Sequence, residues 1–190
     1  MTTLKRIFLV LALTFLSISV SLSNVYAEAL IKDEYRARNI NPGYCGWCCI
    51  QTLCKQQGIK EGFNIVESRK SDPDFWDNGI LCNKGAANDV EIKNKLDKLG
   101  IKFHSLPTKT AFIHIKEFIK LTVEKGQGCL VVVYHGLPTC YGCHAITVVD
   151  INEKEGWYRY IDSNDPIGLY EGSLEWLKVE ATGYVLSVHK

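Results

Sequence analysis

The spacing of apolar and polar positions divides the chain into a first part with helical periodicity and a later part rich in strands. Apolar residues recur every three to four positions in the early stretches, whereas β-branched and alternating runs dominate after residue 128. The predicted helices span residues 45–57, 89–99 and 110–125. The predicted strands span residues 101–106, 129–134, 144–151, 157–162 and 183–188, and a turn with a short helix is expected over 169–177. Helices first and antiparallel strands second predict an α+β fold.

Glycines and short polar residues mark the ends of these elements. Gly58 follows the first helix and Gly100 follows the second, where glycine readily takes the left-handed conformation that closes a helix. Asn88 or Asp89 is placed to cap the start of the second helix. Residues 152–156 have the composition of a hairpin turn, so the two strands that flank them are expected to pair.

The N-terminal 27 residues have the pattern of a secretory signal peptide. Lys5 and Arg6 precede an apolar run over residues 7–20, and Val25-Tyr26-Ala27 is similar to an A-x-A cleavage site. The apolar run is short for a membrane span. We therefore expect cleavage after Ala27, a secreted or periplasmic protein, and no stable membrane insertion of the mature chain. An uncleaved N-terminal anchor is the alternative.

Residues 28–190 are expected to form a single domain, long enough to bury a hydrophobic core. The chain carries 22 basic and 21 acidic residues, and no basic cluster marks one segment, which argues against a nucleic-acid partner. All eight cysteines lie in this domain. In a secreted chain disulfides are expected, and we expect Cys82 to pair with Cys48, Cys49 or Cys54.

Cys45 is the candidate nucleophile. The helix breakers at residues 42–43 place the start of the first helix next to Cys45, and a helix N-terminus lowers the pKa of a thiol by favouring the thiolate. Cys48 is the competing nucleophile. It would lie one turn inside the helix, where the helix dipole acts more weakly.

Two donors for an oxyanion are expected near Cys45. Gly46 lets a substrate carbonyl approach the backbone N–H of Cys45, which would be the first donor. Asn39, six residues before the nucleophile, is the candidate for the second donor through its side-chain amide. Asn41 is the alternative for that second position.

His144 is the candidate general base. It stands at the head of the apolar run over residues 145–149, so it is expected at the start of a strand, on the rim of the sheet. From there an imidazole can reach a thiol at a helix end while the strand anchors it. His135, at the end of the preceding predicted strand, is the alternative.

Asp162 is the candidate for the residue that orients the base. It ends the strand that pairs with the strand of His144, so its carboxylate can reach the ring nitrogen that does not face the thiol. Asp165, which precedes a proline, is a rival, and Asn164 is a second one. A plain turn is also consistent with the segment from Asp162 to Pro166.

Taken in chain order, Asn39, Cys45-Gly46, His144-Ala145 and Asp162 resemble the papain-like cysteine peptidase superfamily. Small bacterial C39-like peptidase domains, in which a Cys-Gly pair opens the first helix, are the most similar branch; Asn39 stands where this family usually has Gln. The resemblance implies a papain-like fold with the nucleophile on the first helix, packed on a C-terminal antiparallel sheet. It also implies hydrolysis of peptide or isopeptide bonds in a peptide or protein substrate, without a cofactor or metal.

Other functions of the cysteines remain open from the sequence. Cys140-x-x-Cys143-His144 fits the attachment pattern of a c-type haem, although a β-branched run rather than a helix follows it. Two C-x-x-C pairs, Cys45/Cys48 and Cys140/Cys143, would suit zinc in a structural or binding protein. The first pair also resembles a thioredoxin-like redox motif, although no strand is predicted before it.

Overall fold

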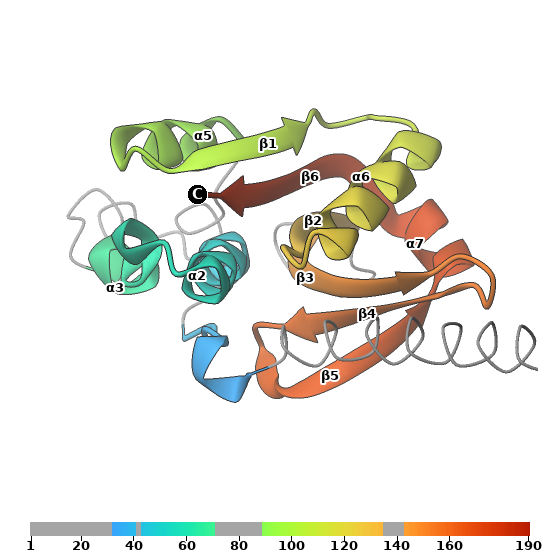
Figure 1. The fold of residues 1–190 in the computed structure, drawn as a ribbon, viewed down its shortest axis with the longest axis horizontal. Helices are drawn as coiled ribbons and strands as arrows, with labels where there is room; N and C mark the ends of the chain where they lie inside the picture. Colours follow the sequence, from blue (N-terminus) through green and yellow to red (C-terminus); the bar gives the residue numbers. More distant parts are fainter. Residues whose placement is uncertain (1–31, 41–42, 71–88, 135–142) are drawn as a thin grey trace, which may run out of the picture.

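The computed structural model describes residues 32–40, 43–70, 89–134 and 143–190. The helical elements in these ranges are η1 (Asp33–Tyr35), α2 (Cys45–Gln57), η2 (Lys60–Gly62), α3 (Ile65–Lys70), α5 (Asp89–Lys98), α6 (Phe112–Glu124) and α7 (Leu174–Glu180). The strands are β1 (Lys102–Leu106), β2 (Cys129–Tyr134), β3 (Cys143–Asn152), β4 (Trp157–Asp162), β5 (Asp165–Ser173) and β6 (Ala181–His189). Figure 1 shows these helices around a single sheet.

The sheet has the strand order β1-β6-β2-β3-β4-β5, and each neighbouring pair is antiparallel. The last strand of the chain therefore lies inside the sheet, between β1 and β2. β3 is central and pairs with β2 on one side and with the hairpin partner β4 on the other. This architecture confirms the predicted α+β fold with helices packed on an antiparallel sheet.

The two larger of the three hydrophobic clusters in the described residues lie on the two faces of the sheet. Because successive side chains of a strand point to opposite faces, Leu130 and Ala145 belong to the cluster that includes residues of α2, α3 and α5, whereas Val131 and Ile146 belong to the cluster that includes residues of α6 and α7. All four side chains are buried. Each large apolar side chain buried in this way contributes about 1.5–3 kcal/mol to folding. The sheet is thus held from both sides, which fixes β3 relative to α2.

The helix α2 is buried over most of its length, and its bounds confirm the predicted range 45–57. Trp47, Ile50 and Leu53 are fully buried within the core on its face of the sheet. The helix ends as predicted, because Gly58 adopts a left-handed conformation with φ of 64° and donates its N–H to carbonyls of the last turn. The buried packing of α2 therefore fixes the position of its first residue, Cys45.

The prediction for residues 169–177 is only partly right. Residues up to Ser173 belong to the edge strand β5, and only then does α7 begin. Pro166 and Gly172 make the sequence of β5 look unlike a strand, but proline is tolerated on an edge strand. At Gly172 a Cβ atom would lie 2.6 Å from the Tyr158 ring, so a larger residue there would force that ring to move.

Several predictions fall outside the described residues, among them the signal peptide over residues 1–27 and the cysteine Cys82. The cysteines in the described ranges are free thiols: Cys45, Cys48, Cys49, Cys54, Cys129 and Cys143. The three cysteines expected to pair with Cys82 are among them, so the expected disulfides are not found there. In the part of the chain that the structure describes, no helix is long and apolar enough to cross a membrane.

Candidate active site

Cys45 is the first residue of α2 and lies against the start of β3. Its sulfur is hydrogen-bonded to His144 and accepts hydrogen bonds from the backbone N–H groups of Ala145 and Gly46. Burial alone would raise the pKa of the Cys45 thiol, but the charge and hydrogen bond of His144, with the two N–H donors, outweigh burial and hold the pKa below its usual value. The contacts around this sulfur therefore favour the thiolate.

His144 faces the thiol and a carboxylate at once. Its Nε2 lies 2.9 Å from Oδ1 of Asp162, and the residue is 8% exposed. Asp162 pairs with Ile146 across β3 and β4, and because alternate residues of a strand share a face, His144 lies on the same face as Asp162. With Nε2 engaged by Asp162, Nδ1 is the ring nitrogen left for Cys45.

The protonation of His144 follows from these contacts. Burial lowers the pKa of the imidazole, but its hydrogen bonds to Asp162 and Cys45 and the negative charges of both raise the pKa to about 9. At neutral pH the imidazole is consequently protonated, and it lies beside a thiol whose pKa is lowered. The contacts therefore place a proton donor beside a thiol that is primed to lose its proton.

Asn39 is linked to the turn that follows Asp162. Its backbone N–H donates to the carbonyl of Ser163 at 2.7 Å, and its Nδ2 donates to Oδ1 of Asn164 at 2.8 Å. The N–H of Asn164 in turn donates to Oδ1 of Asp162 at 2.8 Å. Asn164 therefore links Asn39 to the Asp162 carboxylate through hydrogen bonds. The role of Asn39 as an oxyanion donor stays a prediction.

The rival candidates have different surroundings. Cys48 is fully buried, and burial followed by neighbouring negative charge raises the pKa of its thiol to about 12, so the thiol stays neutral. The carboxylate of Asp165 accepts a hydrogen bond from the hydroxyl of Tyr170 at the exposed edge of the sheet. His135 and Asn41 lie outside the described residues.

The haem and zinc alternatives gain no support from the geometry. Cys143 and His144 begin the strand β3 rather than a helical turn, and Nε2 of His144 is bonded to Asp162. Cys140 lies outside the described residues. Within the described ranges, no group of three or more His, Cys, Asp or Glu side chains is arranged to hold a metal ion.

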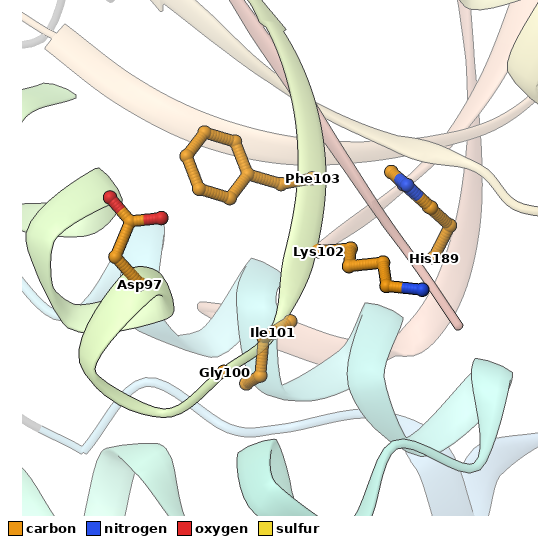
Figure 2. Close-up of a pocket in the computed structure, with 6 residues that line it drawn as sticks. All are labelled: Asp97, Gly100, Ile101, Lys102, Phe103 and His189. Atoms are coloured by element: carbon orange, nitrogen blue, oxygen red, sulfur yellow. The ribbon is translucent and has the colours of Figure 1, made fainter.

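A pocket of about 510 Å³ lies at the β1 edge of the sheet. Its lining residues are Asp97, Gly100, Ile101, Lys102, Phe103 and His189. Figure 2 shows Asp97 and Phe103 on one side of the β1 strand and Lys102 and His189 on the other. The polar groups of this pocket do not converge on one point, and none of them belongs to the group around Cys45.

Comparison with known proteins shows which fold carries this site. No family model matches the chain, and no curated protein matches it. Among solved structures, the peptidase domain of Streptococcus ComA, a bi-functional ABC transporter involved in a quorum sensing pathway, superposes with a TM-score of 0.52 at 16% identity, covering 81% of this chain and 97% of that domain. A double glycine motif protease from an AMS/PCAT transporter, in complex with the leader peptide, gives a TM-score of 0.51 at 11% identity, covering 80% of this chain and 89% of the other. At such identities the likeness concerns the fold, and the chain has the papain-like fold of C39-like peptidase domains.

Proposed function

We propose that this protein is a cysteine peptidase that hydrolyses peptide or isopeptide bonds through Cys45, His144 and Asp162. The observation that carries the proposal is the continuous line of hydrogen bonds from the Cys45 sulfur through the His144 ring to the Asp162 carboxylate. The pKa of the thiol is lowered and that of the imidazole is raised along this line. The papain-like fold supports the same activity.

The reaction begins when the Cys45 thiolate attacks the carbonyl carbon of the scissile bond and forms a tetrahedral oxyanion. As the oxyanion collapses, the C–N bond breaks and the His144 imidazolium gives its proton to the leaving amine. The neutral imidazole then takes a proton from water, whose oxygen attacks the thioester carbon and releases the acid and the thiolate. Asp162 keeps the ring oriented through Nε2 during both steps.

The oxyanion needs donors near the Cys45 sulfur. The first N–H groups of a helix have no partner within the helix, so the N–H of Cys45 at the start of α2 is one donor. The Asn39 amide has two N–H groups, and its bond to Asn164 uses one of them. The second N–H is left for the substrate oxygen, which supports Asn39 as the other donor.

The substrate we propose is a peptide or a protein. A neighbouring structure holds a protease in complex with a leader peptide, which supports a peptide as the ligand of this fold. The balanced charge of the chain gives no attraction to nucleic acid. The signal peptide pattern over residues 1–27 supports a secreted or periplasmic location. Thiol, imidazole and carboxylate carry the whole reaction, so the proposal requires no cofactor or metal.

Digestion of a proteome-derived peptide library tests this activity, because such a library offers many different peptide bonds at once. The wild-type protein should generate new peptide termini, which mass spectrometry detects, and Cys45→Ser should generate none. Cys48→Ala is the matched control, because it removes a neighbouring thiol that is buried and neutral. Equal cleavage by the wild type and Cys45→Ser, or no cleavage by the wild type, would contradict the proposal.

A further inference from the structure

The segment of residues 36–39, which we name the N-terminal strap, joins the helix of the nucleophile to the strands of the carboxylate. In Figure 1 this blue segment lies between α2 and the end of the sheet formed by β4 and β5. The N–H of Ala37 donates to Oγ1 of Thr52 on α2 at 3.0 Å. Two residues later, the N–H of Asn39 donates to the carbonyl of Ser163 between β4 and β5 at 2.7 Å.

Arg36 fastens the strap to the beginning of β5. Its Nη1 donates to the carbonyl oxygens of Pro166 at 2.9 Å, Ile167 at 2.7 Å and Gly168 at 3.4 Å. Successive carbonyls of a regular strand point in alternate directions, so three in a row around one cation mark a local curl of the chain. The side chain of Arg36 is only 3% exposed, and Asp33, 3.2 Å away, is 81% exposed. A guanidinium group is thus buried against backbone oxygens.

This curl is connected to the carboxylate of the site. Asp162 ends β4 and pairs directly with Asp165, the first residue of β5. The turn between them supplies the N–H of Asn164, which donates to the same Oδ1 of Asp162 that faces His144. The Asp162 carboxylate is therefore held by a turn between two fixed segments. β4 precedes this turn, and the residues that Arg36 contacts follow it.

We propose that Arg36 is a positioning residue for the Asp162–His144 pair. By holding residues 166–168 against the N-terminal strap, it fixes the turn after β4 and with it the carboxylate that orients the imidazole. The inference rests on the proposed function, and it adds a residue that touches neither substrate nor reacting atoms.

A purely structural role predicts a different result. If Arg36 only stabilised the fold, its loss would reduce the amount of folded protein and leave the His144 pKa of the folded fraction unchanged. If it acted only through its charge, removing a cation would raise the pKa of the imidazole. Loss of positioning weakens the contact with Asp162 and lowers that pKa. The direction of the shift therefore separates the three roles.

The other titratable groups that face the pair do not interfere near neutral pH. Burial raises the pKa values of four of these groups: Cys48, Cys49, Cys143 and Tyr160. The pKa of the fifth group, Tyr170, is raised first by its hydrogen bond to Asp165. The titration of His144 thus depends on Cys45 and Asp162. NMR of protein with labelled imidazole carbons measures it in the folded chain without substrate.

The test compares Arg36→Met with Arg38→Met, an exposed residue of the same strap. We expect Arg36→Met to lower the His144 pKa by about one unit and to reduce kcat/KM on the order of 10- to 100-fold. Arg38→Met should change neither. In an Asp162→Asn background, Arg36→Met should give no further decrease of the His144 pKa, because the contact it acts through is already altered. Arg36→Lys keeps the charge but lacks the planar guanidinium group, so it should lower the His144 pKa by less than Arg36→Met. This variant is used for the test if Arg36→Met does not fold.

Failure of the proposed function and failure of the proposed role of Arg36 give different results. A His144 pKa near 6.5 in the wild type would contradict the proposed function itself. A wild-type pKa of about 9 that Arg36→Met and Arg36→Lys leave unchanged or raise would overturn the role of Arg36 alone. A full additional loss in the Asp162→Asn background would also overturn it, since Arg36 would then act by another route.

Discussion

At the scale of single residues, the proposed activity depends on the transfer of a proton from Cys45 to His144. Burial opposes charge on both groups, yet each supplies the opposite charge that the other needs. Asp162 adds a carboxylate at the far ring nitrogen, 2.9 Å from Nε2. In a poorly solvated place such direct contacts outweigh the cost of desolvation.

Replacement of the orienting carboxylate tests this balance. Asp162→Asn removes the carboxylate whose hydrogen bond and charge, together with those of Cys45, raise the pKa of His144 to about 9. The imidazolium then loses its proton at lower pH, so the alkaline limb of kcat/KM should move to lower pH. Orienting residues of this kind contribute on the order of 10²- to 10⁴-fold in rate. Kinetics across about pH 5–10 give both quantities.

Asp165→Asn is the matched control for Asp162→Asn. The Asp165 carboxylate is bonded to the Tyr170 hydroxyl at the sheet edge, so its loss should leave the alkaline limb in place. Circular dichroism of both variants shows whether each is folded before rates are compared. If Asp165→Asn abolishes hydrolysis and Asp162→Asn does not, the orienting role belongs to Asp165.

At the scale of elements, the sequence predicts the parts of the site that depend on local pattern. The helix 45–57 follows from its apolar content and Gly58, and its bounds are confirmed. The meeting of His144 with Asp162 follows from two adjacent antiparallel strands whose bounds the pattern indicates. Neither prediction depends on contacts between distant segments. Both are therefore accessible from the sequence.

Other parts depend on contacts between distant segments and leave no local signal. β5 contains a proline and glycines, which are unfavourable in a strand. It forms a strand because it pairs with β4, and tyrosine rings lie close to its glycines. The contact of Arg36 with the carbonyls of residues 166–168 joins segments about 130 positions apart. Arg36 has no feature in the sequence that distinguishes it from the exposed Arg38.

Gly183 at the beginning of β6 gives a prediction for the packing of elements. Its φ is 101°, and a Cβ atom there would lie 2.5 Å from the backbone nitrogen of Thr110 and closer still to that of Lys109. Gly183→Ala should therefore lower the free energy of unfolding by about 1–2 kcal/mol through strain and by about 1–3 kcal/mol more through the clash. Urea unfolding measures the sum.

Gly126→Ala is the control for this prediction. Its φ of 69° is also left-handed, but no atom lies within 4 Å of the Cβ position. Only the strain of about 1–2 kcal/mol is then expected. If both variants lost the same free energy of unfolding, residues 109–110 would be able to move away from the new Cβ atom at little cost, and the expected clash would be contradicted.

At the scale of the whole molecule, the two cores on opposite faces share the strands between them. Cys48 and Cys54 belong to the core on the α2 face, and Cys129 belongs to the core on the α6 face. All three thiols are fully buried. Because β2 and β3 contribute to both cores, we expect the two to unfold together. Thiol alkylation in increasing urea, followed by peptide mapping, should give one midpoint for the three cysteines. Earlier labelling of Cys129 would show that the α6 face opens separately.

The thiolate–imidazolium pair is the central claim, and the rate of iodoacetamide alkylation at Cys45 as a function of pH tests it most directly. Mass spectrometry assigns the label to Cys45 among the other thiols. In the wild type the midpoint should lie well below the ordinary thiol pKa of about 8.5. In His144→Ala, where only the two backbone N–H donors still oppose the effect of burial, the midpoint should rise to that value or above it. A wild-type midpoint at or above about 8.5, an identical midpoint in His144→Ala, or Cys45 found in a native disulfide would contradict the account.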